Sequence, residues 1–168
     1  MEKQLRSRNI PLHSLESFTE LDKFDFIGFS LQFEMCFTTV LNMLDLANIK
    51  IWAKDREENA PFIVGGGPCV YNVEPIADFF DLFVIGEGEE VLSELVDVFV
   101  AWKKEGRPNG RNGFLKRAAR VSGIYVPSLY EPEYDENGTY TGIHPTCEDV
   151  PKMVYKRVVR DMDTVPTM

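Results

Sequence analysis

Leu82-Phe-Val-Ile-Gly-Glu-Gly-Glu-Glu90 and Pro61-Phe-Ile-Val-Gly-Gly-Gly-Pro68 are two apolar runs that each break into glycine. A short apolar run ended by glycine is typical of a strand that is buried on both faces of a parallel sheet. Phe26-Ile-Gly-Phe-Ser-Leu31 has the same character. Helical spacing of apolar residues follows these runs at residues 35–47, 74–80 and 89–104. Three strand–loop–helix units in succession predict an α/β fold with a parallel sheet and flanking helices.

The chain changes character after residue 123. Two segments that suit strands, Leu129–Tyr134 and Thr139–His144, flank a loop that contains the Asn-Gly pair favoured in hairpins. We therefore expect an α/β domain over residues 1–123 and a small antiparallel β appendage over 124–160. The last residues, 161–168, are interpreted as a linker.

The composition of the chain argues against several classes of function. The chain has 168 residues, with 27 Asp and Glu against 18 Lys and Arg, and its formal charge is −9. An acidic chain repels nucleic-acid phosphates and anionic lipids, so neither is expected as a partner. No apolar run is long enough to span a membrane. Three scattered cysteines, Cys36, Cys69 and Cys147, favour a reducing cytoplasm over a disulfide framework.

Glycines directly follow the predicted strands, at Gly65, Gly66, Gly67, Gly86 and Gly88. Ligands of open α/β sheets bind beyond the carboxyl ends of the strands, where glycine lets them approach the backbone. The set therefore suggests a flat ligand platform. The alternative is that each glycine only makes a tight turn, which is its commonest use.

A phosphate does not suit this platform, because neither glycine-rich turn contains Lys or Arg. Glu87, Glu89 and Glu90 place negative charge where a helix is expected to begin, which would repel an anion. Glu89 and Glu90 are interpreted as helix-start residues. Glu87, between two glycines, is the better candidate for a specific hydrogen bond or for bracing the loop.

No catalytic constellation is evident. The two histidines, His13 and His144, are expected at the surface, and the cysteines lack metal-ligand spacing. Asp78 and Asp81 are expected to be cap and turn residues. We predict no catalytic residue and no metal ligand, so the chain is interpreted as a binding or scaffolding domain.

Several of these stretches together resemble a known family. They are residues 25–31, 65–68 and 82–90, together with Pro75 and Asp78. They are similar to the cobalamin-binding-like N-terminal domain found in front of many radical SAM enzymes, above all in an uncharacterised bacterial subfamily. A longer similarity runs through residues 126–130 and 158–161.

This resemblance implies a Rossmann-like (flavodoxin-like) fold with a corrinoid, cobalamin, lying over the strand ends. It implies cofactor-facing roles for Ser30, Gly65, Gly66, Gly67, Gly86, Glu87 and Gly88. The cobalt-ligating motif DxHxxG and the cluster-binding motif CxxxCxxC are absent. We therefore expect no tightly bound cofactor here, and an iron–sulfur cluster and S-adenosylmethionine only in the barrel of the parent protein. The parent is then the enzyme, and its barrel is the partner of this segment.

Two functions remain open at this stage. The chain is either an accessory domain that presents a corrinoid to a radical SAM barrel, or a structural and interaction module that kept the fold without the cofactor. A third, weaker reading is a flavodoxin-like binder of a flat ring, with Tyr71 stacking on it.

The resemblance also implies that the first strand of the domain is missing, and that the chain is a piece of a longer protein. The strand over Phe26–Leu31 would then lack a neighbour on one side, and such an edge is a template for pairing. We expect it to be covered by Ile10–Leu15, by the C-terminal hairpin or by a second copy of the chain. A symmetric dimer is slightly favoured.

Overall fold

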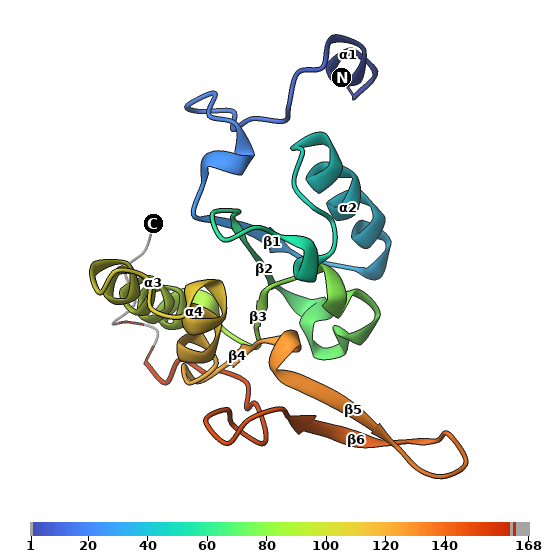
Figure 1. Cartoon of the computed structure of the whole chain (residues 1–168), viewed down its shortest axis with the longest axis vertical. Coiled ribbons are helices and arrows are strands. Elements are labelled where there is room, and N and C mark those ends of the chain that lie inside the picture. Colours follow the sequence, from blue (N-terminus) through green and yellow to red (C-terminus); the bar gives the residue numbers. More distant parts are fainter. Residues whose placement is uncertain (1, 162, 164–168) are drawn as a thin grey trace. The chain divides into compact units, whose positions relative to one another are not determined.

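The computed structural model describes residues 2–161 and 163, so most of the expected linker over 161–168 lies outside the described residues (Figure 1). The chain divides into two compact units, Met1–Asp81 and Leu82–Met168. Each unit is described by itself. No helix among the described residues is long and apolar enough to cross a membrane.

The first unit contains two parallel strands and two α-helices. Its α-helices are α1 (Glu2–Arg8) and α2 (Phe37–Leu46), and short 3-10 turns join the other segments. Strands β1 (Phe26–Ser30) and β2 (Phe62–Gly66) pair in register, so that Ser30 lies opposite Gly66. The apolar side of α2 buries Val40 and Leu44 in the core of this unit.

The second unit combines two long helices with short antiparallel strands. Its elements are β3 (Leu82–Val84), α3 (Gly88–Lys104), α4 (Gly110–Ala118), β4 (Ile124–Tyr125), β5 (Tyr130–Tyr134) and β6 (Tyr140–Pro145). β3 pairs with β4, and β5 pairs with β6 as a separate hairpin (Figure 1). Phe99 and Trp102 of α3 pack their rings on Phe114 of α4, at centroid distances of 5.2 and 5.6 Å.

The fold-class prediction is confirmed: the chain is a mixed α/β protein with parallel strands, flanking helices and a C-terminal antiparallel pair. Some boundaries differ. The helix expected from Met35 begins with a separate 3-10 turn, Glu34–Cys36, which leaves Met35 84% exposed. Helix α4 begins at Gly110, directly after Asn109 in a left-handed conformation. Residues Ile124–Tyr125, expected in the appendage, pair with β3.

The N-terminal segment considered as a cover for β1 makes its backbone bonds elsewhere. The Leu12 N–H donates to the carbonyl of Leu46 at the end of α2, and the Ser14 N–H donates to the carbonyl of Thr19. Within the described part of the first unit, β2 is the strand that pairs with β1. The dimer expected at the β1 edge stays a prediction.

A buried ion pair that the sequence did not reveal joins distant parts of the first unit. Arg56 and Asp81 side chains are 0% and 3% exposed, and Arg56 Nη1 lies 2.8 Å from Asp81 Oδ2. The same oxygen accepts the Ile63 N–H of β2 at 2.7 Å. The second guanidinium nitrogen donates to the carbonyls of Ile51 and Phe79. The expectation that Asp81 is a simple turn residue is therefore wrong, because its carboxylate fixes β2 and the Arg56 loop together.

We predict that Asp81→Ala lowers the free energy of unfolding by about 3–5 kcal/mol, because it leaves a buried guanidinium without its carboxylate. Urea unfolding followed by circular dichroism measures this change. Asp78→Ala removes an exposed carboxylate nearby and is the control, with an expected change within about 0.5 kcal/mol. Equal effects of the two substitutions would contradict the structural role of the pair.

Candidate functional site at the strand ends

The carboxyl ends of β1 and β2 bring Ser30, Gly66 and Gly67 together, as the sequence predicted for neighbouring parallel strands. The Leu31 N–H donates to the Gly66 carbonyl at 2.7 Å, and the Cys69 N–H donates to the Leu31 carbonyl at 3.0 Å. Gly67 has φ +95°, and a Cβ there would lie 3.0 Å from the Leu31 oxygen and 3.2 Å from Ser30 Oγ. Glycine is needed at this position because the loop after β2 lies directly against the end of β1.

The carboxyl-terminal end of one face of this strand pair carries little side-chain bulk, whereas Phe26, Phe62 and Val64 occupy the rest of that face. Gly28 and Ser30 alternate along β1, so they point to the same face, and Gly66 lies opposite Ser30. A Cβ built at Gly28 or Gly66 meets no atom within 4 Å. Ser30 Oγ accepts a hydrogen bond from Gln32 Nε2 at 2.8 Å. Gly65 is buried and lies opposite Phe29, so it faces the other side of the sheet from Gly66.

The other predicted site residues, Gly86, Glu87 and Gly88, lie in the second unit between β3 and α3. Gly86 has φ +101°, and its side without a side chain faces the backbone of Arg157. A Cβ at Gly86 would lie 2.7 Å from the Arg157 nitrogen and closer still to the Arg157 carbonyl oxygen. Arg157 lies 71 residues further along the chain. The space made by Gly86 is thus occupied by the chain's own C-terminal segment.

Backbone hydrogen bonds hold that segment on both sides of Gly86. The Arg157 N–H donates to the Ile85 carbonyl at 2.8 Å, and the Glu87 N–H donates to the Arg157 carbonyl at 3.1 Å. The Glu87 carboxylate accepts the N–H of Val159. Glu87 therefore braces a loop, one of the two roles the sequence suggested for it, and the segment it braces was not foreseen.

The Arg157 side chain completes this arrangement. Its Nη2 lies 2.8 Å from Glu90 Oε2 and 2.6 Å from Glu94 Oε1, one turn apart on α3. The hydrogen bonds that the Arg157 guanidinium donates to Glu90 and then to Glu94 raise its pKa above its ordinary value. Gly123, at φ +91°, makes room for the Arg157 Cβ. We call this set, Ile85–Glu87, Glu90, Glu94 and Gly123 around Arg157–Val159, the Arg157 clasp.

Sequence reasoning missed Arg157, Glu94 and Gly123 as members of this site. The one signal available was the run Gly86-Glu-Gly-Glu-Glu90, whose acids suit a basic partner as well as a helix start. Nothing local in the sequence points from that run to Arg157.

The two histidines make their described contacts elsewhere. His144 Nε2 is 2.6 Å from Glu133 Oε2 on the hairpin, and both side chains are more than half exposed. His13 lies against the Pro11 carbonyl in the N-terminal segment. Over residues 2–161 and 163, no three His, Cys, Asp or Glu side chains group to hold a metal ion.

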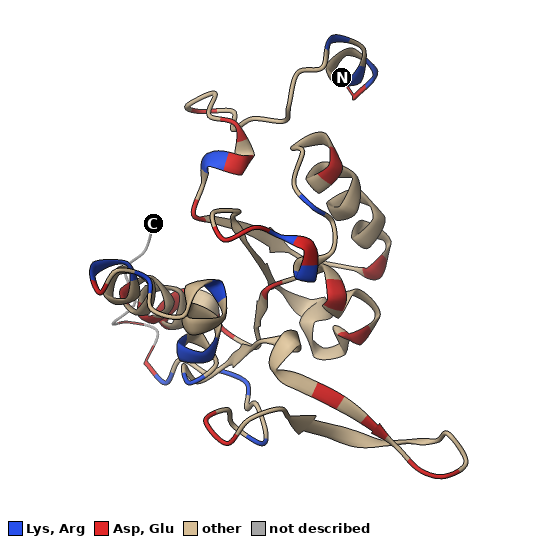
Figure 2. Ribbon diagram, in the orientation of Figure 1, with Lys and Arg blue, Asp and Glu red and all other residues tan. Residues whose placement is uncertain are grey.

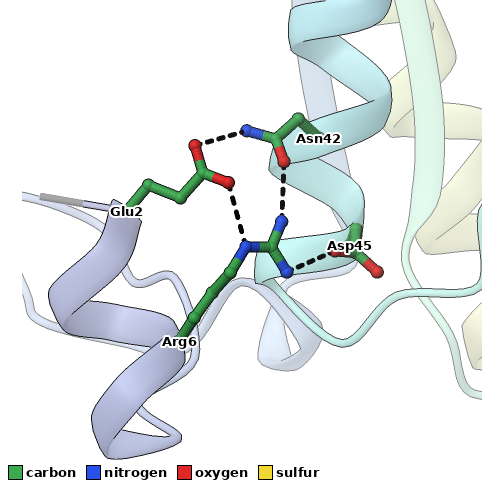
Figure 3. Close-up of polar contacts among 4 residues, drawn as sticks. All are labelled: Glu2, Arg6, Asn42 and Asp45. Carbon is green, nitrogen blue, oxygen red and sulfur yellow. Dashed lines mark hydrogen bonds and ion pairs between the residues drawn. The ribbon is translucent and has the colours of Figure 1, made fainter.

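A separate polar cluster attaches α1 to α2 (Figure 3). Arg6 lies 2.9 Å from Glu2, 2.7 Å from Asp45 and 2.7 Å from the Asn42 side-chain oxygen. Asn42 in turn donates to the second oxygen of Glu2 at 3.2 Å. The side chains drawn bond to one another across the two helices, so this cluster has a structural role.

The chain belongs to the family described as "Radical SAM proteins, N-terminal", whose model matches residues 1–127. This confirms the resemblance at the level of an accessory domain of a radical SAM protein. The chain is also 33% identical over 97 residues to an uncharacterized protein of Methanocaldococcus jannaschii, an alignment that covers 55% of this chain. The chain spans only 20% of that relative's length. No solved structure matches the chain.

We predict that Gly86→Ala loosens the Arg157 clasp, because a methyl group at φ +101° overlaps the Arg157 backbone. Backbone strain of about 1–3 kcal/mol would speed hydrogen exchange of the Arg157 and Val159 amides roughly 10- to 100-fold. Gly28→Ala, which meets open space, is the control and leaves these amides unchanged. Unchanged exchange in Gly86→Ala would mean that the segment is not held there.

The attachment of α1 should depend on pH. Hydrogen bonds from Arg6 and then Asn42 hold the pKa of Glu2 below its ordinary value. A lowered folded-state pKa stabilises the attached helix above the unfolded pKa, and this stabilisation is lost as the pH falls through the folded pKa. Hydrogen exchange of α1 should therefore accelerate, relative to α3, when the pH falls from neutral to about 3. Glu2→Gln should remove most of that pH dependence; an unaltered pH profile would contradict it.

Proposed function

We propose that this chain is a non-catalytic accessory domain that acts through protein contacts, and that its Gly86–Gly88 turn holds the C-terminal segment of the chain. The observation that carries this proposal is the close approach of Arg157 to Gly86. Two backbone–backbone hydrogen bonds, one hydrogen bond from a backbone N–H to the Glu87 carboxylate, an ion pair with two carboxylates and two glycines at positive φ serve this one contact. Such a concentration of constraints suits a device that fixes where a segment leaves a domain.

In this proposal the chemistry of a radical SAM protein belongs elsewhere in the whole protein. An iron–sulfur cluster and S-adenosylmethionine would be bound by a radical SAM domain, and this chain would be its partner. The family match to an N-terminal region and the relative's much greater length support that division. No reaction step is assigned to residues of this chain.

A corrinoid fits the Gly86–Gly88 turn poorly. The Glu87 N–H and carboxylate are both engaged with the C-terminal segment, and the space beside Gly86 holds the Arg157 backbone. To bind there, a flat ring would first have to displace the Arg157 clasp. His13 lies against the Pro11 carbonyl and His144 against Glu133. Among the described residues, neither imidazole is therefore placed at this turn to ligate cobalt.

A ligand at the open face of β1 and β2 is the second candidate. Gly28, Ser30 and Gly66 leave the carboxyl-terminal end of that face open, and the Ser30 hydroxyl and Gln32 amide supply hydrogen-bonding groups. A ring, whether a corrinoid or a flavin, would lie over this end of the strand pair, beside Val64. Tyr71, 65% exposed in the turn after β2, is the aromatic side chain that the flat-ring reading requires.

Titration with hydroxocobalamin separates the two candidates. If the domain acts through protein contacts alone, the visible spectrum of hydroxocobalamin stays unchanged on adding the protein. The ligand is then not retained on gel filtration. The whole protein should be tested beside this chain, since a radical SAM domain could contribute to a shared site.

Stoichiometric binding would contradict the proposal and favour the open face. Gly66→Val locates the ligand in that case, because a side chain at Gly66 enters open space and leaves the fold intact. Loss of binding in Gly66→Val, with binding retained in Arg157→Ala, would assign the ligand to β1 and β2.

A further inference from the structure

Helix α3 is apolar over a wider arc than the core uses. Its buried side chains are Val91, Leu95, Phe99 and Trp102. Beside them three more apolar side chains are solvent-exposed: Leu92 at 49%, Val96 at 49% and Val100 at 40%. A helix that packs on one core needs an apolar stripe roughly 100° wide, and α3 presents a second one beside it. Contiguous exposed apolar surface of this kind marks a contact site.

The exposed residues are arranged symmetrically about Val96. Leu92 and Val100 lie four residues to either side, and Glu89 and Lys103 lie seven residues to either side. At 100° per residue, all five fall within an arc of about 80°. We call these five residues the α3 stripe.

The two ends of α3 carry opposite charges. The first turn of α3 carries Glu89 and Glu90, and the last turn carries Lys103 and Lys104 (Figure 2). When two copies of such a helix pair antiparallel about a twofold axis, each end meets its opposite charge. Val96 then meets Val96 of the second copy, Leu92 meets Val100, and Glu89 meets Lys103.

We propose that the α3 stripe is a self-complementary interface through which two copies of this chain associate antiparallel. This inference is independent of the proposed function. The stripe is symmetric in spacing and complementary in charge. A second copy satisfies both properties at once, as an isologous contact requires.

The Arg157 clasp leaves this surface available. Glu90 and Glu94, which bind Arg157, lie about 120° and 160° from Val96 around the helix axis. Lys103 lies over the Phe99 ring, with Nζ 5.1 Å from the centroid, so its head group is held beside the stripe. The three apolar side chains cover much less area than a standard interface of about 800 Å² per partner. We therefore expect a weak, concentration-dependent dimer.

Sedimentation velocity of the unmodified chain, from micromolar to sub-millimolar concentration, tests the proposal. The chain should shift from monomer to dimer over this range. Val96→Asp places two carboxylates at the twofold axis and should abolish the dimer. Leu15→Asp is the matched control, since it puts the same charge on another exposed apolar residue, 84% exposed in the N-terminal segment, and should leave association unchanged.

A charge exchange tests the antiparallel orientation. Glu89→Lys alone and Lys103→Glu alone each create two like-charge contacts, and each should weaken association about tenfold. The double variant Glu89→Lys, Lys103→Glu restores opposite charges and should recover the association of the unmodified chain. Circular dichroism and urea unfolding of each variant show that its fold is intact.

A chain that stays monomeric at every concentration overturns the proposal. So does a dimer that survives Val96→Asp, which would point instead to the β1 edge. Failure of the double variant to recover association would reject the antiparallel arrangement.

Discussion

The backbone of Arg157 lies so close to Gly86 that no residue with a Cβ fits between them, and the second unit is organised around this contact. β3 reaches it through Ile85, α3 through Glu90 and Glu94, and the turn before β4 through Gly123. Each of these elements has its own reason to form, and this contact ties all three to the segment around Arg157. The ion pair is partly exposed and contributes modestly by itself. The steric fit and the backbone hydrogen bonds make the contact specific.

The contact between Gly86 and Arg157 shows that glycine at a strand end can make room for the chain itself. Glycine after a parallel strand permits close approach, and a sequence alone does not say whether a ligand or the chain itself approaches. In the second unit the chain itself does so. In the first unit Gly67 is likewise taken up by Leu31 and Ser30, whereas Gly28 and Gly66 border open space. An accessory domain built in this way can position a neighbouring segment without holding a cofactor.

Local patterns predicted the elements of this fold well. The apolar runs became β1, β2 and β3, the spacing of Val91, Leu95 and Phe99 became α3, and the Asn-Gly pair joined β5 to β6. These features depend on residues close together in the chain. The buried Arg56–Asp81 pair joins residues 25 positions apart, the ion pairs of Arg157 with Glu90 and Glu94 join residues 67 and 63 positions apart, and both escaped prediction. A lone Arg among charged neighbours carries no sign that it is buried, so only the fold could reveal its partner.

We propose that the Gly86–Gly88 turn binds the chain's own segment in preference to a cofactor. Hydrogen exchange of the Arg157 and Val159 amides in the unmodified protein, measured with and without saturating hydroxocobalamin, tests it directly. We predict that the Arg157 and Val159 amides are protected and that hydroxocobalamin leaves their exchange rates unchanged. Amides that exchange at the rate of an unstructured chain, or that lose protection when hydroxocobalamin is added, would contradict it.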